Sequence, residues 1–506
     1  MLILYMKNGG MSMLTKWDSA FGKNDIRGIY GEDVTEELFF FVGKAYVYYI
    51  SNLSDKKPKD LWITVCRDAR NHSSALVKSL IGGVTSAGAN IVDLGLAPTP
   101  IGYYSDVVGI NSSVTEDNCI DGALIVTASH NPSQYNGLKM TYNSQILGEQ
   151  AIQDLLRIVA DVSKQSLLSH TFGKKEEYDL IPDYINVMKL NFGRIGEGVK
   201  IVVDSANGTG GVVAPSLYRS LGCEVIELYS NPDGNFPNHH PNPSDEKTLD
   251  AIKRAVVENN ADFGIAFDGD SDRIGVIDSQ GKSMTGDKLL LIYALDIIEK
   301  YRALDVEPVV VSEVKCSQVL FDTINNSGAK AIMCKTGHGF IKAKMKETNA
   351  VLAGEMSGHT FFKDRYYGFD DAVYAGCRMI EIVAKHKKVN PSFKVEDLLE
   401  PFSKIYSSQE VRLACPNELK KTVLEQFETY VNDNPDMFGS KIKDIITIDG
   451  MRIVFDGGFA LVRQSNTEPV FTLRFEAKTK EECERFENAM VSVLEGFVNN
   501  CNSMAK

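Results

Sequence analysis

The chain has 506 residues, enough for three or four domains of about 100–200 residues each, and its 43% hydrophobic and 24% charged content is ordinary for a globular protein. Its 54 lysine and arginine residues against 67 aspartate and glutamate residues give a net charge of −13, which argues against general nucleic-acid binding, because such binding depends on clustered positive charge. No apolar run approaches the length of a membrane-spanning helix, about 20 residues, and the opening MLILYM is too short for a secretory signal, so no membrane association is expected.

Residues 1–16 contain several methionines that could start the chain, and we expect them to form a loose tail. Beyond them, three segments repeat one pattern: a strand, a helix that ends at a glycine, and a second strand. Their first strands are LWITVCRD (61–68), KIVVDSAN (200–207) and PVVVSEVK (308–315). A glycine suits the left-handed backbone that often ends a helix, and such strand–helix–strand units are typical of α/β domains. The repetition therefore predicts three similar α/β units.

Each copy continues into a further strand that ends in an unusual loop. These loops are TASHNP (127–132), DGDSDR (268–273) and GEMSGH (354–359). Ligands in open α/β sheets bind beyond the carboxyl ends of the strands. Three such loops at equivalent places predict units with a mixed sheet between helices, facing one central cleft; coincidence in a strand-rich sequence is the alternative.

The C-terminal part of the chain has a different pattern. Strands are predicted at 410–413 and 446–455 and helices at 419–430 and 481–498, which indicates an α+β domain. The predicted fold class is therefore α/β, with three similar units and a fourth, C-terminal α+β domain around the cleft. The predicted domain boundaries are 1–175, 176–281, 282–399 and 400–506.

The loop DGDSDR carries three alternating carboxylates. Alternate side chains of an extended segment share one face, so Asp268, Asp270 and Asp272 repel one another unless a cation lies between them. Hard oxygen ligands suit Mg²⁺ or Ca²⁺, but an EF-hand would need Gly and Glu where Arg273 and Ser279 stand. The loop therefore predicts Mg²⁺ that also holds a phosphate, with a solvated acidic turn as the alternative.

Two further loops and one strand end supply groups that suit a sugar phosphate. RQSNTEP (463–469) combines a guanidinium, hydroxyls, an amide and turn N–H groups, which are donors for a phosphate; a polar hairpin turn is the alternative. GEMSGH offers a carboxylate and a hydroxyl between glycines that let a ligand approach closely, which suits sugar hydroxyls. KTGHGF (335–340) adds Lys335 and His338, although a lone histidine is often structural.

Two other motif-like segments do not support other enzyme classes. GVIDSQGKS (275–283) has five residues between its glycines, one more than a nucleotide P-loop has. GEMSGH is not a G-x-S-x-G nucleophile elbow, because Glu355 occupies the first glycine position. The sequence therefore supports neither a P-loop nucleotide hydrolase nor an α/β-hydrolase.

Ser129 follows a predicted strand, and considered alone it is best explained as an ordinary strand end. In a chain that also has a metal loop and a phosphate loop, it becomes a candidate carrier of a phosphoryl group, because phosphoryl transfer depends on positioning and charge neutralisation. A nearby cation favours a phosphate dianion, and His130 and Lys139 would add positive charge.

The loops TASHNP, DGDSDR, GEMSGH and RQSNTEP, in this order, resemble the four signature loops of the α-D-phosphohexomutases, and the resemblance extends along the chain from Phe21 onward. The segments DIRGIYG, KTGHGFIK and FKDRYYGFDDAVYAG are most similar to the bacterial phosphomannomutase/phosphoglucomutase branch. Glu468 departs from the residue that is common in that branch, a difference that we do not expect to change the chemistry.

The resemblance implies reversible intramolecular phosphoryl transfer between C1 and C6 of mannose or glucose phosphate. Ser129 is then phosphorylated in the resting enzyme, donates to the substrate to form a hexose 1,6-bisphosphate, and is rephosphorylated by the other phosphoryl group of that intermediate, which also acts as activator. A phosphoglucosamine mutase is the alternative within the family, and a non-catalytic sugar-phosphate-binding protein is the alternative outside it.

The resemblance also implies roles for individual residues. The catalytic residues are Ser129, His130, Lys139 and Arg273. One Mg²⁺ per chain is held by Ser129, Asp268, Asp270 and Asp272. Sugar O3 and O4 are bound by Glu355 and Ser357, and the non-transferring phosphate by Arg463, Ser465, Asn466 and Thr467. Further substrate contacts come from Arg27, Tyr30, Lys315, His338 and His359.

The expected partners are hexose phosphates alone, with no nucleic acid and no membrane. We expect a monomer, with a dimer as the alternative. Nine scattered cysteines without a CxxC pair indicate reduced thiols and a cytoplasmic protein.

Overall fold

The computed structural model describes residues 17–110, 119–164, 172–465 and 468–504. The predicted loose tail, 1–16, and two residues of the predicted phosphate loop, Asn466 and Thr467, lie outside the described residues. Internal packing divides the chain into two compact units. Unit 1 is Met1–Ala255, Ile265–Ile274 and Asp371–Cys377; unit 2 is Val256–Gly264, Gly275–Asp370 and Arg378–Lys506. None of the helices that the structure describes is long and apolar enough to cross a membrane.

The first sheet of unit 1 is mixed and has seven strands. They are β1 (Ile26–Ile29), β2 (Trp62–Arg67), β3 (Asn90–Leu96), β4 (Gly122–Val126), β5 (Tyr135–Tyr142), β6 (Gln145–Ile146) and β7 (Lys175–Glu177). Their order is β1-β5-β4-β2-β3-β7, with β6 beside β5. The strands β2, β3, β4 and β7 are parallel, whereas β5 pairs antiparallel with β1, β4 and β6.

Four helices cover this sheet: α1 (Glu36–Ser54), α2 (Ser73–Ser86), α3 (Thr99–Val108) and α4 (Glu149–Val162). Successive side chains of a strand point to opposite faces. Val65 and Leu124 share one buried core with residues of α1, α2 and α4, whereas Ile125 lies against Gly102 of α3. The sheet therefore lies between helices, as predicted.

The second sheet has the order β12-β11-β10-β8-β9, and the division between the two units runs through β10 and β11. Its strands are β8 (Lys200–Asp204), β9 (Glu224–Leu228), β10 (Phe263–Phe267), β11 (Ile274–Ile277) and β12 (Ser283–Met284). The helices of this part of the chain are α5 (Ile181–Phe192), α6 (Ala214–Ser220) and α7 (Asp250–Glu258).

The third sheet, in unit 2, has the order β14-β13-β15-β16. Its strands are β13 (Val309–Glu313), β14 (Lys330–Cys334), β15 (Leu352–Gly354) and β16 (Thr360–Phe362). The first three are parallel and β16 is antiparallel to β15. The neighbouring helices are α8 (Gly286–Arg302), α9 (Gln318–Asn326), α10 (His338–Thr348) and α11 (Ala372–Val389).

The three copies of the sequence repeat have the same topology. In each sheet, the first strand of the repeat lies between its third and second strands, as in β4-β2-β3, β10-β8-β9 and β15-β13-β14. The glycines that were expected to end the helices, Gly88, Gly222 and Gly328, all have positive φ, between 88° and 100°. The loops that follow β4, β10 and β15 are therefore topologically equivalent, and the predicted repeat is confirmed.

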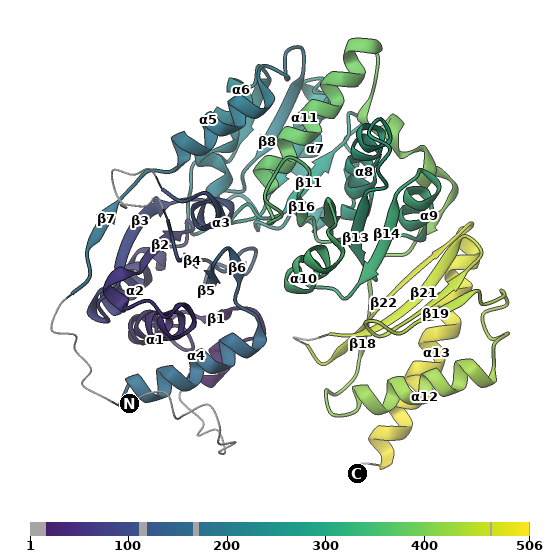
Figure 1. Ribbon diagram of the computed structural model, residues 1–506. Helices are drawn as coiled ribbons and strands as arrows, with labels where there is room; N and C mark the ends of the chain where they lie inside the picture. The colour runs from purple at the N-terminus through teal and green to yellow at the C-terminus, as the bar shows by residue number, and fades with distance from the viewer. Residues whose placement is uncertain (1–16, 111–118, 165–171, 466–467, 505–506) are drawn as a thin grey trace. The chain divides into compact units, whose positions relative to one another are not determined.

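The C-terminal domain, in unit 2, is an antiparallel sheet with the order β17-β22-β21-β20-β19, and β18 also pairs with β22. Its strands are β17 (Tyr406–Ser407), β18 (Val411–Ala414), β19 (Asp444–Ile446), β20 (Met451–Phe455), β21 (Gly458–Gln464) and β22 (Val470–Ala477). The helices α12 (Lys420–Asp433) and α13 (Lys480–Met504) lie on one face of this sheet (Figure 1) and bury Phe427, Phe486 and Leu494 against it.

The prediction of one strand over 446–455 is wrong. Within that range only Met451–Phe455 forms a strand, β20; Ile446 ends β19, which pairs antiparallel with β20 across a turn in which Gly450 has a φ of 82°. Asp449-Gly450, a dipeptide typical of hairpin turns, is the sequence signal that marks this turn. The fold class, three similar α/β units followed by a C-terminal α+β domain, is confirmed.

Candidate active site

Ser129 lies in the loop that follows β4, and its hydroxyl contacts an acidic group far away in the sequence. Oγ donates to Asp268 Oδ2 at 2.6 Å and lies 3.1 Å from His130 Nδ1. The side chain is buried, and the backbone has a φ of 50°, a left-handed conformation that costs a non-glycine residue about 1–3 kcal/mol. Strain of this kind is concentrated at functional sites, which makes Ser129 more than an ordinary strand end.

The three carboxylates of DGDSDR converge in the loop that follows β10. Oxygens of Asp268, Asp270 and Asp272 lie within 4.8 Å of one another, and all three residues are buried. Burial, followed by the charges of Asp272 and Asp270, raises the pKa of Asp268 well above its usual value, although Arg273 and the Ser129 hydroxyl oppose the shift. The structure therefore excludes the solvated acidic turn that was the alternative.

Lys139, on β5, is the cation that lies against this carboxylate cluster. Its Nζ donates to Asp270 Oδ2 at 3.0 Å and also binds Asp272. Thr99, at the start of α3, donates its hydroxyl to the same Asp270 oxygen at 2.6 Å. The other oxygen, Asp270 Oδ1, is buried and accepts no hydrogen bond from any residue that the structure describes.

The carboxylate cluster fits a divalent metal ion. Carboxylate oxygens are the ligands that hard divalent cations prefer, and the three side chains offer one oxygen each, all within 4.8 Å of one another. The unbonded Asp270 Oδ1 is a buried acceptor that requires a partner, because a buried polar atom without one costs free energy. Lys139 supplies one positive charge in contact with the cluster and Arg273 a second one nearby, against three carboxylates, so the cluster has negative charge left for a cation.

Gly269 allows the carboxylate loop to approach the serine loop. A Cβ at this position would lie 2.6 Å from the carbonyl oxygen of Ser129, closer than any real contact of that kind. We expect Gly269→Ala to push the two loops apart, to cost about 1–3 kcal/mol of stability as overpacking does, and to lower kcat by about 10–100-fold, because a shift near 1 Å has that effect on chemistry. Steady-state kinetics and urea unfolding measure both effects.

Gly148 offers a matched control for this substitution. A Cβ there would meet nothing within 4 Å, and its φ is −83°. Gly148→Ala should leave kcat near its original value, although the loss of a helix N-cap glycine costs some stability. Equal kinetics for Gly269→Ala and the unsubstituted protein would show that the close approach is unnecessary.

Arg273 and Arg27 flank the serine and carboxylate loops. Arg273 donates its backbone N–H to Asp268 Oδ1 at 3.2 Å, and its Nη1 lies 3.4 Å from His130 Nε2. Arg27, on β1, donates from Nη1 to Asn131 Oδ1 at 3.0 Å in the serine loop. Burial lowers the pKa of Arg27, but Asp25 and, from farther away, the carboxylate cluster raise it above its usual value. All these groups belong to unit 1.

Tyr30 supports the serine loop through its backbone and its ring. Its N–H donates to the carbonyl of Gln134 at 2.9 Å, and its ring stacks on His72 with 4.4 Å between centroids. Its hydroxyl donates to Glu36 Oε1 at 2.5 Å, and Glu36 belongs to the same domain. A substrate contact of Tyr30 stays a prediction.

The loop that follows β15 holds a hydrogen-bonded carboxylate. Glu355 Oε1 accepts from the N–H of Gly337 at 2.7 Å, Oε2 lies 2.9 Å from His359 Nδ1, and Ser357 Oγ lies 3.2 Å from that same nitrogen. Burial raises the pKa of Glu355, but the bond to His359, the charges of His359 and His338, and the bond from Gly337 lower it to about 2. The carboxylate is therefore ionised at neutral pH and is a strong acceptor for hydroxyl groups.

The other residues of unit 2 that were predicted to contact the substrate lie beside the Glu355 carboxylate or at the end of a neighbouring strand. The ring of His338 stacks on His359 with 5.9 Å between centroids. Lys315 follows β13, where its Nζ lies 3.8 Å from Glu313 Oε1. Thr336 links the two strand ends, because its hydroxyl donates to Glu313 at 2.7 Å.

The predicted phosphate loop follows β21. Arg463 is buried, and its Nε donates to Asp449 Oδ2 at 3.1 Å, while the same oxygen accepts from the N–H of Thr336 at 3.1 Å. Ser465 Oγ accepts from the N–H of Glu468 at 3.2 Å, which closes the turn. Asp449 thus ties the phosphate loop to the strand end that carries His338, a connection within unit 2.

Two buried cations that support the loops were missed by the sequence analysis. Arg70 binds the backbone of the serine loop, and Lys420 donates to the carbonyls of Ser465 and Glu468 at 2.8 and 2.5 Å. The only signal for Arg70 was its place just after β2, at the carboxyl edge where ligands bind. Lys420 had no signal, because it lies 45 positions before Ser465 at the start of a helix.

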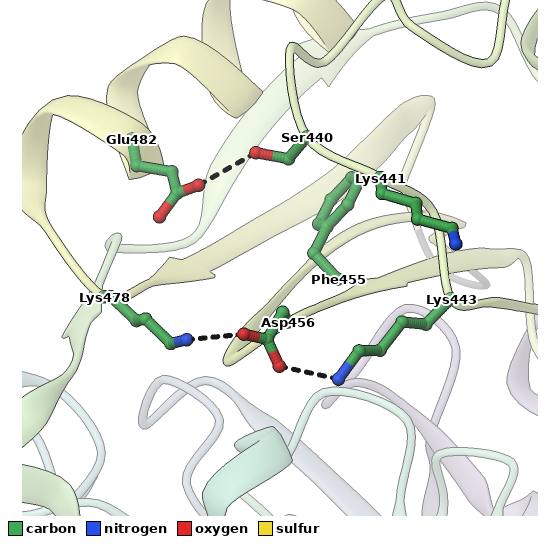
Figure 2. A pocket seen from close by; sticks show the side chains of 7 residues that line it. All are labelled: Ser440, Lys441, Lys443, Phe455, Asp456, Lys478 and Glu482. Atoms are coloured by element: carbon green, nitrogen blue, oxygen red, sulfur yellow. Dashed lines mark hydrogen bonds and ion pairs between the residues drawn. The ribbon is translucent and has the colours of Figure 1, made fainter.

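A pocket of about 290 Å³ in the C-terminal domain shares no residue with these loops. Figure 2 shows Asp456 between Lys443 and Lys478, each of which donates to it at 2.6 Å. Three lysines line the pocket, and two of them, Lys443 and Lys478, are already paired with Asp456. The pocket is therefore a poor candidate for a phosphate site. It is lined by Ser440, Lys441, Lys443, Phe455, Asp456, Lys478 and Glu482.

Comparison with known proteins identifies the family. The chain matches four families described as phosphoglucomutase/phosphomannomutase: alpha/beta/alpha domain I over residues 18–166, domain II over 182–281, domain III over 285–402 and the C-terminal domain over 410–493. The chain belongs to the phosphoglucomutase/phosphomannomutase family, whose members are phosphohexomutase enzymes.

Relatives along nearly the whole length support the same conclusion. A phosphomannomutase/phosphoglucomutase of Pseudomonas aeruginosa is 37% identical over 94% of this chain and 95% of its own, and a phosphoglucomutase of Neisseria gonorrhoeae is 36% identical over 94% and 96%. The crystal structure of a phosphoglucomutase/phosphomannomutase family protein from Burkholderia thailandensis matches with a TM-score of 0.83 at 33% identity, over 96% of this chain and 98% of the other. The predicted family, its bacterial branch and the enzyme class are confirmed.

Proposed function

We propose that this enzyme interconverts the 1-phosphates and 6-phosphates of mannose and glucose, with Ser129 as the carrier of the phosphoryl group. The observation that carries the proposal is the hydrogen bond of 2.6 Å between Ser129 Oγ and Asp268, inside a buried cluster of three carboxylates. A hydroxyl beside a divalent-cation site is where a phosphoserine would have its charge neutralised. The names of the relatives in Pseudomonas and Neisseria support mannose and glucose as the sugars.

The proposed reaction has two balanced transfers. In the first, the bond between phosphorus and Ser129 Oγ breaks, a bond forms from phosphorus to the free sugar hydroxyl oxygen, and that hydroxyl loses its proton to a base. In the second, the other phosphoryl group of the hexose 1,6-bisphosphate moves to Ser129 Oγ, and the sugar oxygen that it leaves takes up a proton. No phosphate is consumed, so catalytic amounts of the bisphosphate restore enzyme that has lost its phosphate.

The groups around Ser129 are proposed to act as follows. Asp268, Asp270 and Asp272 would hold one Mg²⁺, which when bound supplies positive charge to the phosphoryl oxygens. His130 and Lys139 are the proposed proton-transfer groups, because His130 Nδ1 lies 3.1 Å from Ser129 Oγ and Lys139 Nζ lies among the carboxylates. Arg273 would add positive charge, since its guanidinium lies beside His130.

The groups of unit 2 are proposed to bind the rest of the substrate. The ionised Glu355 and the hydroxyl of Ser357 would accept and donate hydrogen bonds to sugar O3 and O4. Arg463 and Ser465 would bind the phosphate that is not transferred, together with Asn466 and Thr467. Lys315, His338 and His359, with Arg27 and Tyr30, complete the proposed substrate contacts.

We further propose a monomeric enzyme of a reducing, cytoplasmic compartment. All nine cysteines are free thiols in the structure, which supports that location.

The proposed function is tested by phosphorus NMR with purified protein, Mg²⁺ and a trace of glucose 1,6-bisphosphate. We expect glucose 1-phosphate and mannose 1-phosphate to give their 6-phosphates, with glucosamine 1-phosphate turned over more slowly. The intact mass should show a fraction of the chain about one phosphate heavier. Binding of hexose phosphates without interconversion would overturn the proposal, and preference for glucosamine 1-phosphate would replace it by the glucosamine enzyme.

A further inference from the structure

Arg70 is fully buried in the loop that follows β2, and it binds four backbone carbonyls of the serine loop. Its Nη2 donates to Ser129 O at 2.9 Å and to Asn131 O at 2.6 Å. Its Nη1 donates to Pro132 O at 2.6 Å and to Tyr135 O at 3.0 Å. A guanidinium has five N–H donors, so four of the five serve the backbone of residues 129–135.

The fifth donor binds Asp68, which in turn bonds the start of the same loop. Arg70 Nε donates to Asp68 Oδ2 at 3.0 Å, and that oxygen also accepts from the Thr127 hydroxyl at 3.0 Å. The Thr127 hydroxyl accepts from the N–H of Ser129 at 2.9 Å. A continuous chain of hydrogen bonds therefore leads from the Arg70 guanidinium to both the N–H and the C=O of Ser129.

The arrangement has two consequences for a phosphoryl group on Ser129. First, carbonyl oxygens that converge on one point repel one another, and a guanidinium at that point turns the repulsion into charge-assisted bonds. The loop can then hold Ser129 at its strained φ of 50°. Second, the carbonyls of Ser129 and Asn131 are bonded to Arg70 and are not free to point their negative ends at a phosphate.

We propose that Arg70 is a positioning residue for phosphoryl transfer: it holds the loop 129–135 in the one conformation in which Ser129 Oγ is aimed at Asp268. This inference rests on the proposed role of Ser129. Arg70 touches neither Ser129 Oγ nor the carboxylate cluster, so its effect on the reaction is transmitted through the loop backbone. Phe236, from another part of unit 1, covers the guanidinium with its ring, whose centroid lies 5.4 Å from Arg70 Cζ.

A purely structural role would lower stability without a specific effect on phosphoryl transfer. Asp68 retains four other donors when Arg70 is replaced, namely the N–H of Arg70's own position, the hydroxyls of Ser73 and Thr127, and the N–H of Ala128. In Arg70→Met the Asp68 carboxylate therefore loses its ion pair but keeps hydrogen bonds to both oxygens, and we expect the substituted chain to fold with a lower melting temperature.

The test compares Arg70→Met and Arg70→Lys in the full-length protein. The phosphorylated protein, in excess over glucose 6-phosphate, is mixed with it and quenched within a single turnover, and the formation of glucose 1,6-bisphosphate and glucose 1-phosphate is followed; steady-state kcat, KM and melting temperature are measured in parallel. We expect transfer and kcat to fall about 100-fold, the effect of misplacing a reacting group by about 1 Å, while KM changes little. Lysine keeps the charge but has one nitrogen in place of the fork, so it should not restore the rate.

Arg378 provides the matched control. It is as fully buried as Arg70, but it lies in unit 2, where it pairs with Asp364 Oδ2 at 2.9 Å and donates to the Asp364 carbonyl at 3.1 Å. Arg378→Met should lower the melting temperature and leave single-turnover transfer near its original rate.

The outcomes separate this inference from the proposed function. Transfer at the original rate in either Arg70 variant, or an equal loss of transfer in Arg378→Met at equal loss of melting temperature, overturns the role of Arg70. Full activity of Ser129→Ala would instead overturn the proposed carrier. Should Arg70→Met fail to fold, Arg70→Lys decides alone.

Discussion

Ser129→Ala is expected to lower the rate of hexose-phosphate interconversion by about 10⁴-fold or more, because it removes the atom that carries the phosphoryl group. A 10⁴-fold loss corresponds to about 5.4 kcal/mol of activation free energy. The loop should keep its conformation, since Arg70 binds the carbonyl of Ser129 and the Thr127 hydroxyl binds its N–H, and neither contact uses the side chain. A coupled assay of 6-phosphate formation measures the rate, and intact mass should show no phosphorylated fraction.

Ser133, an exposed residue of the same loop, offers the control. Ser133→Ala should retain both the activity and the phosphorylated fraction. A melting temperature of Ser129→Ala close to that of the unsubstituted protein would show that the loss is chemical. Retention of full activity by Ser129→Ala would exclude Ser129 as the carrier of the phosphoryl group.

Removal of divalent cations with a chelator is expected to abolish activity, and Mg²⁺ should restore it. Three buried carboxylates whose oxygens lie within 4.8 Å of one another require more positive charge than Lys139 and Arg273 together supply. Binding should also raise the melting temperature, because a ligand at about 100 times its dissociation constant stabilises the folded protein by about 2.7 kcal/mol. Calorimetric titration with Mg²⁺ gives the stoichiometry, expected to be one per chain.

Asp268→Asn tests whether the carboxylate loop is the metal site. The substitution keeps the shape of the side chain and removes one negative charge, so the Mg²⁺-dependent rise in melting temperature should shrink or vanish. Asp278→Asn is the control, because Asp278 is buried but accepts backbone N–H groups from Gln280 and Lys282 in a hairpin turn. An unchanged Mg²⁺ effect in Asp268→Asn would place the metal elsewhere.

Much of the fold could be predicted because its signals are local. The strands WITVCR, KIVVD and VVVSE are runs of apolar and β-branched residues, and each helix that follows ends at a glycine with positive φ. The hairpin of β19 and β20 was missed because apolar residues lie on both sides of its turn and suggest one continuous strand. Its turn is set by Gly450, whose Cβ would clash with the carbonyl of Val462 on the neighbouring strand β21. That constraint comes from another part of the chain.

The candidate site was predictable in its residue types and not in its contacts. The carboxylates of DGDSDR and the hydroxyl of TASHNP are conspicuous in the sequence, because each follows a buried strand directly. Arg70 was inconspicuous, since an arginine after a strand is usually a solvated side chain, and only the fold reveals that it is buried with all five donors in use. Gly269 was equally inconspicuous in the sequence, because it acts through the absence of a side chain beside the carbonyl oxygen of Ser129.

The sequence by itself determined the three-fold repeat, the composition of each loop and, through four loops in order, the family. Only the tertiary structure decided that Ser129 and Asp268, which are 139 positions apart, share a hydrogen bond. The physical reason is the shared topology of the first two sheets. Parallel strands end at one edge of a sheet, so the loops after β4 and β10 come to the carboxyl edges of their sheets whatever their separation along the chain. Their final approach then depends on Gly269, Arg70 and Lys139, whose contacts are formed only when the chain is folded.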